Sequence, residues 1–549
     1  MKRTSRTAIL CISTSLLLLA VPQVDAGDAE TPMASRSSPP GPRLVLLLAV
    51  DQLRRDRLDP ELAGGLGRLV RGGRVYREGV LDHAGTSTCP GHVSIATGRH
   101  PGPAGVPGNT HLNRETGASV YCVEDKSPDA AVLGQAPEEP GRSPRKIGVD
   151  ALGDWMKRAN PETRVFGVSP KDRAAIAFAG QHPDGAYWIA RAGGFTTSRY
   201  YADELPEWVQ QWNRGFFERL PAEWTFEYAL EGERADDYRA ESDKFGRSAP
   251  HKILDEQPED TMQGLWRSPA LDDLTLDFAR ELVEHERLGQ GPATDLLALS
   301  LSATDVIGHT YGPESHESHD SLRRLDRKLG EFLDFLDERL GAGNTLVALS
   351  ADHGVAALPE WLEDTGRSRC PVAGGRADIR WLIGRLMVEL WWEFSPLFSI
   401  PGAWVHASGS GIIVSQEMAN RHGVDPARVL AAAKLYLEEQ PVIEKVWTPE
   451  EILSGTSPMA ELFQHSFHPD RTGDLIVQIR RDCLMTPGDA GTTHGSPYLY
   501  DREVPIVFYG NGVEPGEISG TARTIDIAPT LARHLGIDVP EDLHGQALQ

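Results

Sequence analysis

Short apolar runs of strand length, separated by amphipathic helical patterns, most constrain what this chain can fold into. Such alternation is typical of a parallel β-sheet with helices on both of its faces. We therefore predict an α/β fold, with a large, mostly parallel sheet, helices on both faces and inserted smaller subdomains. The expected strands are residues 44–50, 165–168, 296–301 and 346–349, followed by later runs at 475–479 and 506–509.

The clearest expected helix lies between the third and fourth of these runs. Apolar residues recur at three- and four-residue spacing over residues 322–340, with charged residues between them. Gly341 is well placed to end this helix. Two further helical patterns cover residues 274–288 and 376–392.

Two segments interrupt the alternation of strands and helices. Residues 181–270 are rich in Trp, Tyr and Pro and show no regular pattern. About 140 residues separate His353 from His494, which is too many for one crossover connection. We therefore expect one domain over residues 43–549, with insertions at about 181–270 and 360–485.

The amino terminus has the pattern of a secretory signal peptide. Basic residues precede an apolar run that is shorter than the about 20 residues of a membrane-spanning helix, and Ala26 is a small residue suited to cleavage. We predict a signal peptide at residues 1–26, a flexible leader at 27–42 and a periplasmic or extracellular location. An uncleaved anchor is the alternative.

The formal net charge of −24 limits the partners of this chain. So acidic a protein is not expected to bind nucleic acid or anionic membranes. No later apolar segment predicts membrane insertion once the signal peptide is removed, and we expect a monomer. An anionic substrate would need concentrated positive charge at its site, which a pair of metal ions would supply.

The cysteines point to structural bridges. Of five in the chain, Cys11 lies inside the amino-terminal apolar run. The remaining four permit up to two disulfides with three possible pairings, and no CxxC spacing suggests a thiolate metal site. These four are Cys89, Cys122, Cys370 and Cys483.

Metal-type ligands follow several of the expected strands. In open α/β sheets, ligands bind at the carboxyl ends of strands, and Asp and His without Cys suit zinc with an open position. One Asp after a strand is more often a helix cap, but here the coincidence repeats. Asp305 and His309 stand four residues apart, so one helical turn could direct both at one ion. The candidate ligands are Asp51, Asp305, His309, Asp352, His353 and His494.

The segment from Thr88 to His92 indicates a nucleophile at the start of a helix. Thr88 is followed by x-Pro-Gly-His, and a helix amino terminus stabilises an alkoxide and a phosphoryl oxygen. A hydroxyl is a weak nucleophile at its free pKa, so it needs activation by a metal ion. The alternative is that Thr88 only caps the helix.

The order Asp, Thr-x-Pro-Gly-His, Asp-x-x-x-His, Asp-His-Gly and Thr-His-Gly resembles the alkaline-phosphatase superfamily. More narrowly, it resembles the type I phosphodiesterase/nucleotide pyrophosphatase group. The resemblance implies an alkaline-phosphatase-like catalytic domain with two zinc ions per chain, no third, magnesium site and a phosphothreonine intermediate on Thr88. One zinc would take Asp305, His309 and His494, and the other would take Asp51, Asp352, His353 and the Thr88 oxygen.

A second resemblance concerns the substrate. Lys171-x-Arg173, together with Asn109 about twenty residues after Thr88, is similar to the phosphate-irrepressible bacterial alkaline phosphatases. It implies that Asn109, Lys171 and Arg173 bind the phosphoryl oxygens and take part in catalysis. The implied function is a secreted zinc-dependent alkaline phosphatase that hydrolyses small-molecule phosphate monoesters, with broad specificity, for phosphate scavenging.

Three alternative functions compete with this interpretation. A sulfatase shares the fold but needs Cys or Ser in a C-x-P-x-R type motif, whereas this chain has Thr88 and His92. A phosphodiesterase or nucleotide pyrophosphatase would share Thr88 and every metal ligand, but its typical context lacks the Lys-x-Arg pair. A non-catalytic binding protein on the same scaffold would be expected to lack at least one ligand.

Overall fold

A computed structural model describes residues 41–549, except 137–138, 229–233, 396–401 and 410. The predicted signal peptide and nearly all of the predicted leader lie outside the described residues. Within the described part of the chain, no helix combines the length and the apolar character needed to cross a membrane.

The core of the described chain is a nine-stranded sheet in the order β21-β2-β20-β13-β1-β12-β7-β8-β9. Its centre is parallel, because β1 pairs in parallel with β12 and β13, and β12 with β7. The strand β20 is antiparallel to both of its neighbours. The nine strands are β1 (Leu44–Val50), β2 (Arg74–Val80), β7 (Val165–Val168), β8 (Gly185–Ile189), β9 (Phe195–Thr196), β12 (Asp295–Leu301), β13 (Thr345–Ser350), β20 (Ile506–Gly510) and β21 (Gly516–Arg523).

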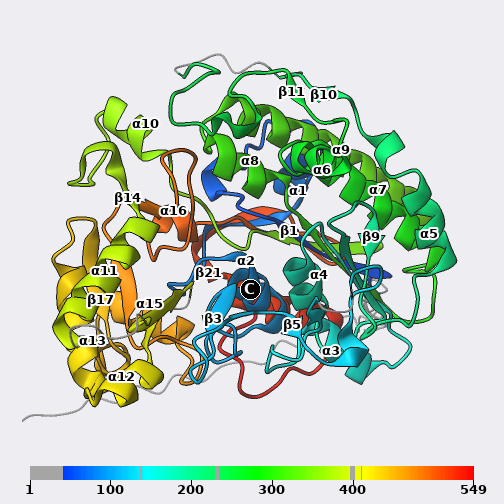
Figure 1. Ribbon diagram of the computed structural model, residues 1–549. Helices are drawn as coiled ribbons and strands as arrows, with labels where there is room; N and C mark the ends of the chain where they lie inside the picture. Colours follow the sequence, from blue (N-terminus) through cyan, green and yellow to red (C-terminus); the bar gives the residue numbers. More distant parts are fainter. Residues whose placement is uncertain (1–40, 137–138, 229–233, 396–401, 410) are drawn as a thin grey trace, which may run out of the picture. The chain divides into compact units, whose positions relative to one another are not determined.

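Helices cover both faces of this sheet, as the α/β prediction requires (Figure 1). Along β1 the side chains alternate between two apolar cores: Leu46 packs in one and Leu47 in the other. Both faces are therefore buried, which explains why the strand is apolar along its whole length. One face is covered by α1 (Gly65–Gly72), α7 (Ala270–His285) and α9 (His316–Leu340), and the other by α2 (Thr88–Thr97), α3 (Leu152–Ala159), α4 (Asp172–Ala179) and α17 (Ile527–Leu535).

The helix expected at 322–340 is α9, and it begins six residues earlier, at His316. The Ser315 side chain caps it by accepting a hydrogen bond from the Ser318 amide. Gly341 follows the helix with φ of 90°, a backbone conformation that glycine adopts without strain. The patterns at 274–288 and 376–392 correspond to α7 and to α11 (Ile379–Phe394).

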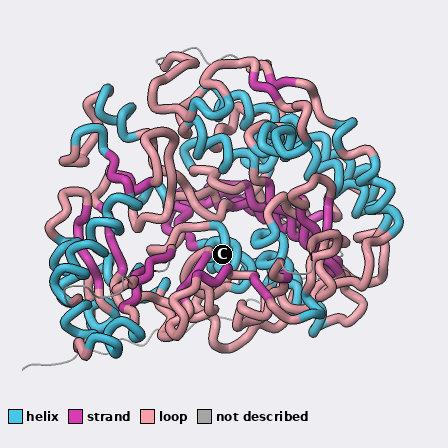
Figure 2. The backbone as a smooth tube through the Cα atoms, viewed as in Figure 1, coloured by secondary structure: helices cyan, strands magenta, loops and turns pink. Residues whose placement is uncertain are grey.

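Residues 376–486 build small sheets and an apolar core of their own. The run at 475–479 does form a strand, β18, but it pairs with β17 and not with the central sheet. Figure 2 shows these short strands apart from the central sheet. Elements of this segment include β14 (Arg376–Asp378), β15 (Val405–Ser408), β16 (Gly411–Val414), α13 (Pro426–Glu438), β17 (Ile443–Trp447), α15 (Pro458–Ser466), β18 (Ile476–Ile479) and β19 (Leu484–Thr486).

The other segment expected to be an insertion, 181–270, begins with β8 and β9, which complete one edge of the central sheet. It continues through α5 (Glu207–Arg214) and α6 (Pro258–Trp266). The boundaries of both insertions stay a prediction. The cysteine pairing left open by the sequence is Cys89 with Cys122 and Cys370 with Cys483.

Candidate active site

The predicted metal ligands lie beyond the carboxyl ends of neighbouring parallel strands. Asp51 directly follows β1, and Asp352 lies two residues beyond β13. Asp305 is in the first turn of α8 (Ala303–Tyr311), which starts just after β12. Because β1 lies between β12 and β13 in register, the three segments meet at one edge of the sheet.

One group consists of Asp305, His309 and His494. His309 Nε2 lies 3.2 Å from Asp305 Oδ1, and His494 Nε2 lies 3.7 Å from the same oxygen. His494 is on the loop that follows β19, more than 180 residues away from Asp305 in the chain. One donor atom from each of the three lies within 4.8 Å of the other two.

The second group consists of Asp51, Asp352 and His353, and all three side chains are fully buried. His353 Nε2 lies 3.4 Å from Asp51 Oδ1 and 3.4 Å from Asp352 Oδ2. Burial and the charges of Asp305 and Asp352 raise the pKa of Asp51. The carboxylates of Asp51, Asp305 and Asp352 repel one another when all are ionised, so a positive charge between them would stabilise the ionised forms.

Each of the three histidines is held in the tautomer that a metal ion requires. The Nδ1 atoms donate to main-chain carbonyls, which leaves every Nε2 with a free lone pair directed at the carboxylates. The hydrogen bonds are His309 to Thr492 at 2.8 Å, His353 to Gly354 at 3.0 Å and His494 to Thr86 at 2.7 Å.

These residues fit bound metal ions. Among the described residues, Asp51 Oδ1, Asp352 Oδ2 and His353 Nε2 are buried and have no hydrogen-bond partner. Buried polar atoms are nearly always satisfied, so these lone pairs are suited to a cation. Carboxylate and imidazole donors are those zinc takes in catalytic sites. The two groups are also the two ligand sets that the sequence resemblance implied, apart from the Thr88 oxygen.

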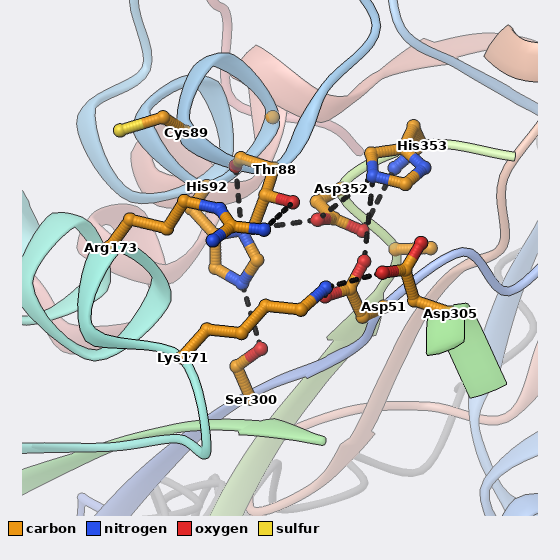
Figure 3. Close-up of polar contacts among 12 residues, drawn as sticks. Asp51, Thr88, Cys89, His92, Lys171, Arg173, Ser300, Asp305, Asp352 and His353 are labelled. Atoms are coloured by element: carbon orange, nitrogen blue, oxygen red, sulfur yellow. Dashed lines mark hydrogen bonds and ion pairs between the residues drawn. The ribbon is translucent and has the colours of Figure 1, made fainter. Parts of the chain in front are cut away.

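Thr88 is the first residue of α2 and is almost completely buried. Arg173 Nη2 donates to Thr88 Oγ1 at 3.3 Å, and Asn109 Oδ1 accepts the Cys89 amide at 2.8 Å. That contact leaves the amide nitrogen of Asn109 as a donor beside the helix start. The structure therefore places two of the three predicted phosphoryl-binding side chains next to the predicted nucleophile. Figure 3 shows the contact of Arg173 with Thr88.

Lys171 lies among the ligand carboxylates. Its Nζ forms ion pairs with Asp51 and Asp305, one carboxylate from each ligand group (Figure 3). Burial alone would lower the pKa of Lys171, but Asp305 and Asp51 raise it. The positive charge of Lys171 therefore lies between carboxylates of the two ligand groups. Its Nζ contacts are with these carboxylates and not with Thr88.

Several residues of the site were missed by the sequence reasoning. Gln52, with φ of 67°, donates its backbone amide to Asp352 at 3.1 Å and its side chain to Asp305 at 2.7 Å. His92, noted only as part of the motif, bonds to Ser300 Oγ at 2.8 Å and lies 3.4 Å from Asp352 Oδ2. In the sequence, these two residues are marked only by their positions: Gln52 directly follows the ligand Asp51, and His92 follows Thr88 by one helical turn.

Tyr121 is a third residue of the site, and it belongs to none of the motifs described above. Its hydroxyl accepts from Arg173 Nη1 at 3.3 Å and donates to Asp172 at 2.6 Å. The adjacent Cys122 is joined to Cys89, so the disulfide connects this tyrosine to the start of α2.

Comparison with known proteins assigns the family. The model of the type I phosphodiesterase/nucleotide pyrophosphatase family matches residues 45–497. The chain belongs to this family. The matched residues include every member of both ligand groups, from Asp51 to His494.

Individual relatives are similar over nearly the whole chain. Alkaline phosphatase PhoK of Sphingomonas sp is 32% identical over 91% of this chain and 89% of its own. A protein of Myroides odoratus named calcium-transporting ATPase is 32% identical over 92% of this chain and 94% of its own. The crystal structure of alkaline phosphatase PafA superposes with a TM-score of 0.86 at 28% identity, over 93% of this chain and 99% of PafA. The predicted superfamily and fold are thus confirmed.

Proposed function

We propose that this chain is a secreted, zinc-dependent alkaline phosphatase that hydrolyses phosphate monoesters through a phosphothreonine on Thr88. The observation that carries the proposal is the convergence of two ligand groups with Thr88, whose hydroxyl Arg173 contacts. The similarity to PhoK and PafA along nearly the whole chain supports monoester hydrolysis. Residues 43–549 would form the catalytic domain, and small phosphate esters would be its substrates.

The chemistry would proceed in two displacements at phosphorus. Zinc, when bound, supplies Lewis acidity and the positive charge that an anionic ester needs. The Thr88 oxygen forms the bond to phosphorus while the bond to the leaving-group oxygen breaks, and water then cleaves the phosphothreonine. The amino terminus of α2 would direct the positive end of its dipole at the transferred group.

The residues around Thr88 would favour a monoester. A monoester dianion presents three non-bridging oxygens, whereas a diester carries a carbon substituent on one of them. Arg173 offers a planar fork and Asn109 a neutral donor, and such fixed donors act most strongly on charge in the transition state. We include Lys171 in this set, because its Nζ pairs with one carboxylate of each ligand group and so brings a positive charge to the site.

A phosphodiesterase or nucleotide pyrophosphatase stays the second candidate, since it would use the same nucleophile and ligands. Replacing both Lys171 and Arg173 with Ala decides between the two. We expect monoester kcat/KM to fall by at least about 10³ and diester hydrolysis to fall far less or to rise. Both rates are measured on one zinc-loaded preparation, with p-nitrophenyl phosphate and its bis-ester.

Two controls keep this test specific. Zinc content is measured for each variant, because Lys171 contacts two ligands and its loss could alter metal binding. Arg145→Ala removes a surface arginine paired with Asp129 and should leave both rates unchanged. Parallel losses on both substrates, at full zinc content, would favour the phosphodiesterase.

A further inference from the structure

A third group of carboxylate and imidazole side chains lies outside the proposed active site. Asp82 follows β2, His100 follows α2, and His465 belongs to α15 of the inserted segment. One donor atom from each lies within 4.8 Å of the other two. In the described part of the chain, only the two active-site groups share this arrangement.

The distances within this group resemble those in the active site. His100 Nε2 lies 2.9 Å from Asp82 Oδ2, and His465 Nδ1 lies 3.8 Å from the same oxygen. In the active-site groups, the corresponding nitrogen–oxygen distances are 3.2, 3.4 and 3.7 Å. The Asp82–His100 distance is that of a hydrogen bond, and the His465 distance is measured from Nδ1, whereas the active-site distances are measured from Nε2.

His465 also has the backbone contact that fixes the active-site histidines. Its Nδ1 donates to the main-chain oxygen of Asp82, as the Nδ1 atoms of His309, His353 and His494 donate to carbonyls. A histidine held in this way presents Nε2 with a free lone pair, which is the usual form of a metal ligand.

Unpartnered buried atoms lie at the same place. Among the described residues, Asp82 Oδ1 and both ring nitrogens of His83 are buried without a hydrogen-bond partner. The ligand atoms Asp51 Oδ1, Asp352 Oδ2 and His353 Nε2 have the same property. Native proteins seldom leave such atoms unsatisfied. A bound cation would satisfy the lone pairs at this group, as it would in the active site.

We propose that Asp82, His100 and His465 bind a third metal ion and that their donor set selects zinc. One carboxylate and two imidazoles without a thiolate are common zinc ligands, and three protein ligands leave one tetrahedral position open. Asp82 lies six residues before Thr88, and His100 lies three residues after α2 ends. The ion would therefore hold the inserted segment against both ends of the nucleophile helix.

Two neighbours define the competing arrangement. Arg523 Nη1 lies 3.7 Å from Asp82 Oδ2, although its guanidinium also bonds to Asp526 at 2.8 Å. The His100 ring stacks on His465 with centroids 3.5 Å apart and on His544 with centroids 4.6 Å apart. The alternative is thus a metal-free stack of imidazoles, held by the hydrogen bond between Asp82 and His100.

Counting metal ions separates the two arrangements without any measurement of activity. The full chain is saturated with zinc, freed of loosely bound ions and measured by elemental analysis and native mass spectrometry. We expect His465→Ala to hold one zinc fewer per chain than the unaltered protein. The matched control is His468→Ala, which removes a neighbouring histidine outside the group and should hold the full number.

A crystal of the unaltered, zinc-loaded protein gives a second test that no misfolded variant can obscure. We expect an anomalous peak at the zinc edge about 2.0–2.2 Å from Asp82 and the two histidines. Equal zinc content in His465→Ala and the unaltered protein, or no such peak, would overturn the proposal in favour of the stack. Zinc at the active-site groups is counted separately in the same map, so failure there leaves this result readable.

Discussion

The side chains of the candidate active site are oriented by hydrogen bonds with individual residues around them. The three active-site histidines owe their orientation to main-chain carbonyls: that of Gly354 lies within the Asp-His-Gly motif, whereas those of Thr86 and Thr492 are far in the chain from the histidines that they hold. Gln52 links the two ligand groups, and Gly308 leaves it room, because a Cβ at Gly308 would lie 1.9 Å from Gln52 Oε1. The ligands are local to their motifs, whereas Thr86 and Thr492, which orient two of the histidines, are distant from them in the chain.

Thr88 can be tested as the covalent nucleophile. Thr88→Ala should lower turnover by at least about 10³, because no other hydroxyl takes its place at the start of α2. Thr88→Ser keeps the oxygen and should retain much of the activity. Acid quenching during turnover should trap phosphate on Thr88 in the peptide that contains Cys89, and phosphate on the neighbouring Ser87 would show that the assignment is wrong.

At the scale of elements, the prediction from sequence succeeded where the signal is local. The runs at 44–50 and 165–168 match β1 and β7, because an apolar run bounded by turn residues is enough to indicate a strand. The run at 475–479 has the same appearance, yet it pairs with β17. Periodicity indicates that a strand exists, but it does not indicate which sheet the strand joins.

The same limit explains what was missed in the sites. Asp305 could be selected because it follows a strand and stands one helical turn from His309. Asp82, His100 and His465 follow no such rule, since they come from a loop, a helix end and an inserted helix. Their proximity depends on how the inserted segment packs, and a single sequence carries no signal for that.

The disulfide between Cys89 and Cys122 offers a test at this scale. Replacing both with Ala should lower the free energy of unfolding by about 2–5 kcal/mol. It should also lower kcat, because Tyr121 loses its link to the start of α2 and contacts Arg173 less firmly. Urea unfolding and kinetics on one preparation check both effects.

The second disulfide is the matched control. Cys370 and Cys483 are far from Thr88 in the chain. Their disulfide joins the two ends of the inserted segment. Replacing this pair should cost a similar free energy of unfolding but leave kcat nearly unchanged. If both pairs change kcat equally, the first disulfide has no particular role in positioning Tyr121.

At the scale of the whole molecule, the net charge of −24 and the buried acidic ligands make the protein depend on bound cations. Exhaustive chelation should abolish phosphatase activity, and zinc should restore it better than magnesium. Magnesium prefers six oxygen ligands, whereas each group here offers imidazole nitrogen. Activity that survives complete removal of zinc would contradict the site. The assay is run with metal content measured at each step.

The disulfide between Cys89 and Cys122 also relates full activity to the compartment in which the chain folds. Thiols stay reduced in an ordinary cytoplasm, while export brings a chain into oxidising surroundings. A copy that folded before export would lack the crosslink beside its nucleophile. Maturation of an exported copy would then be coupled to its delivery.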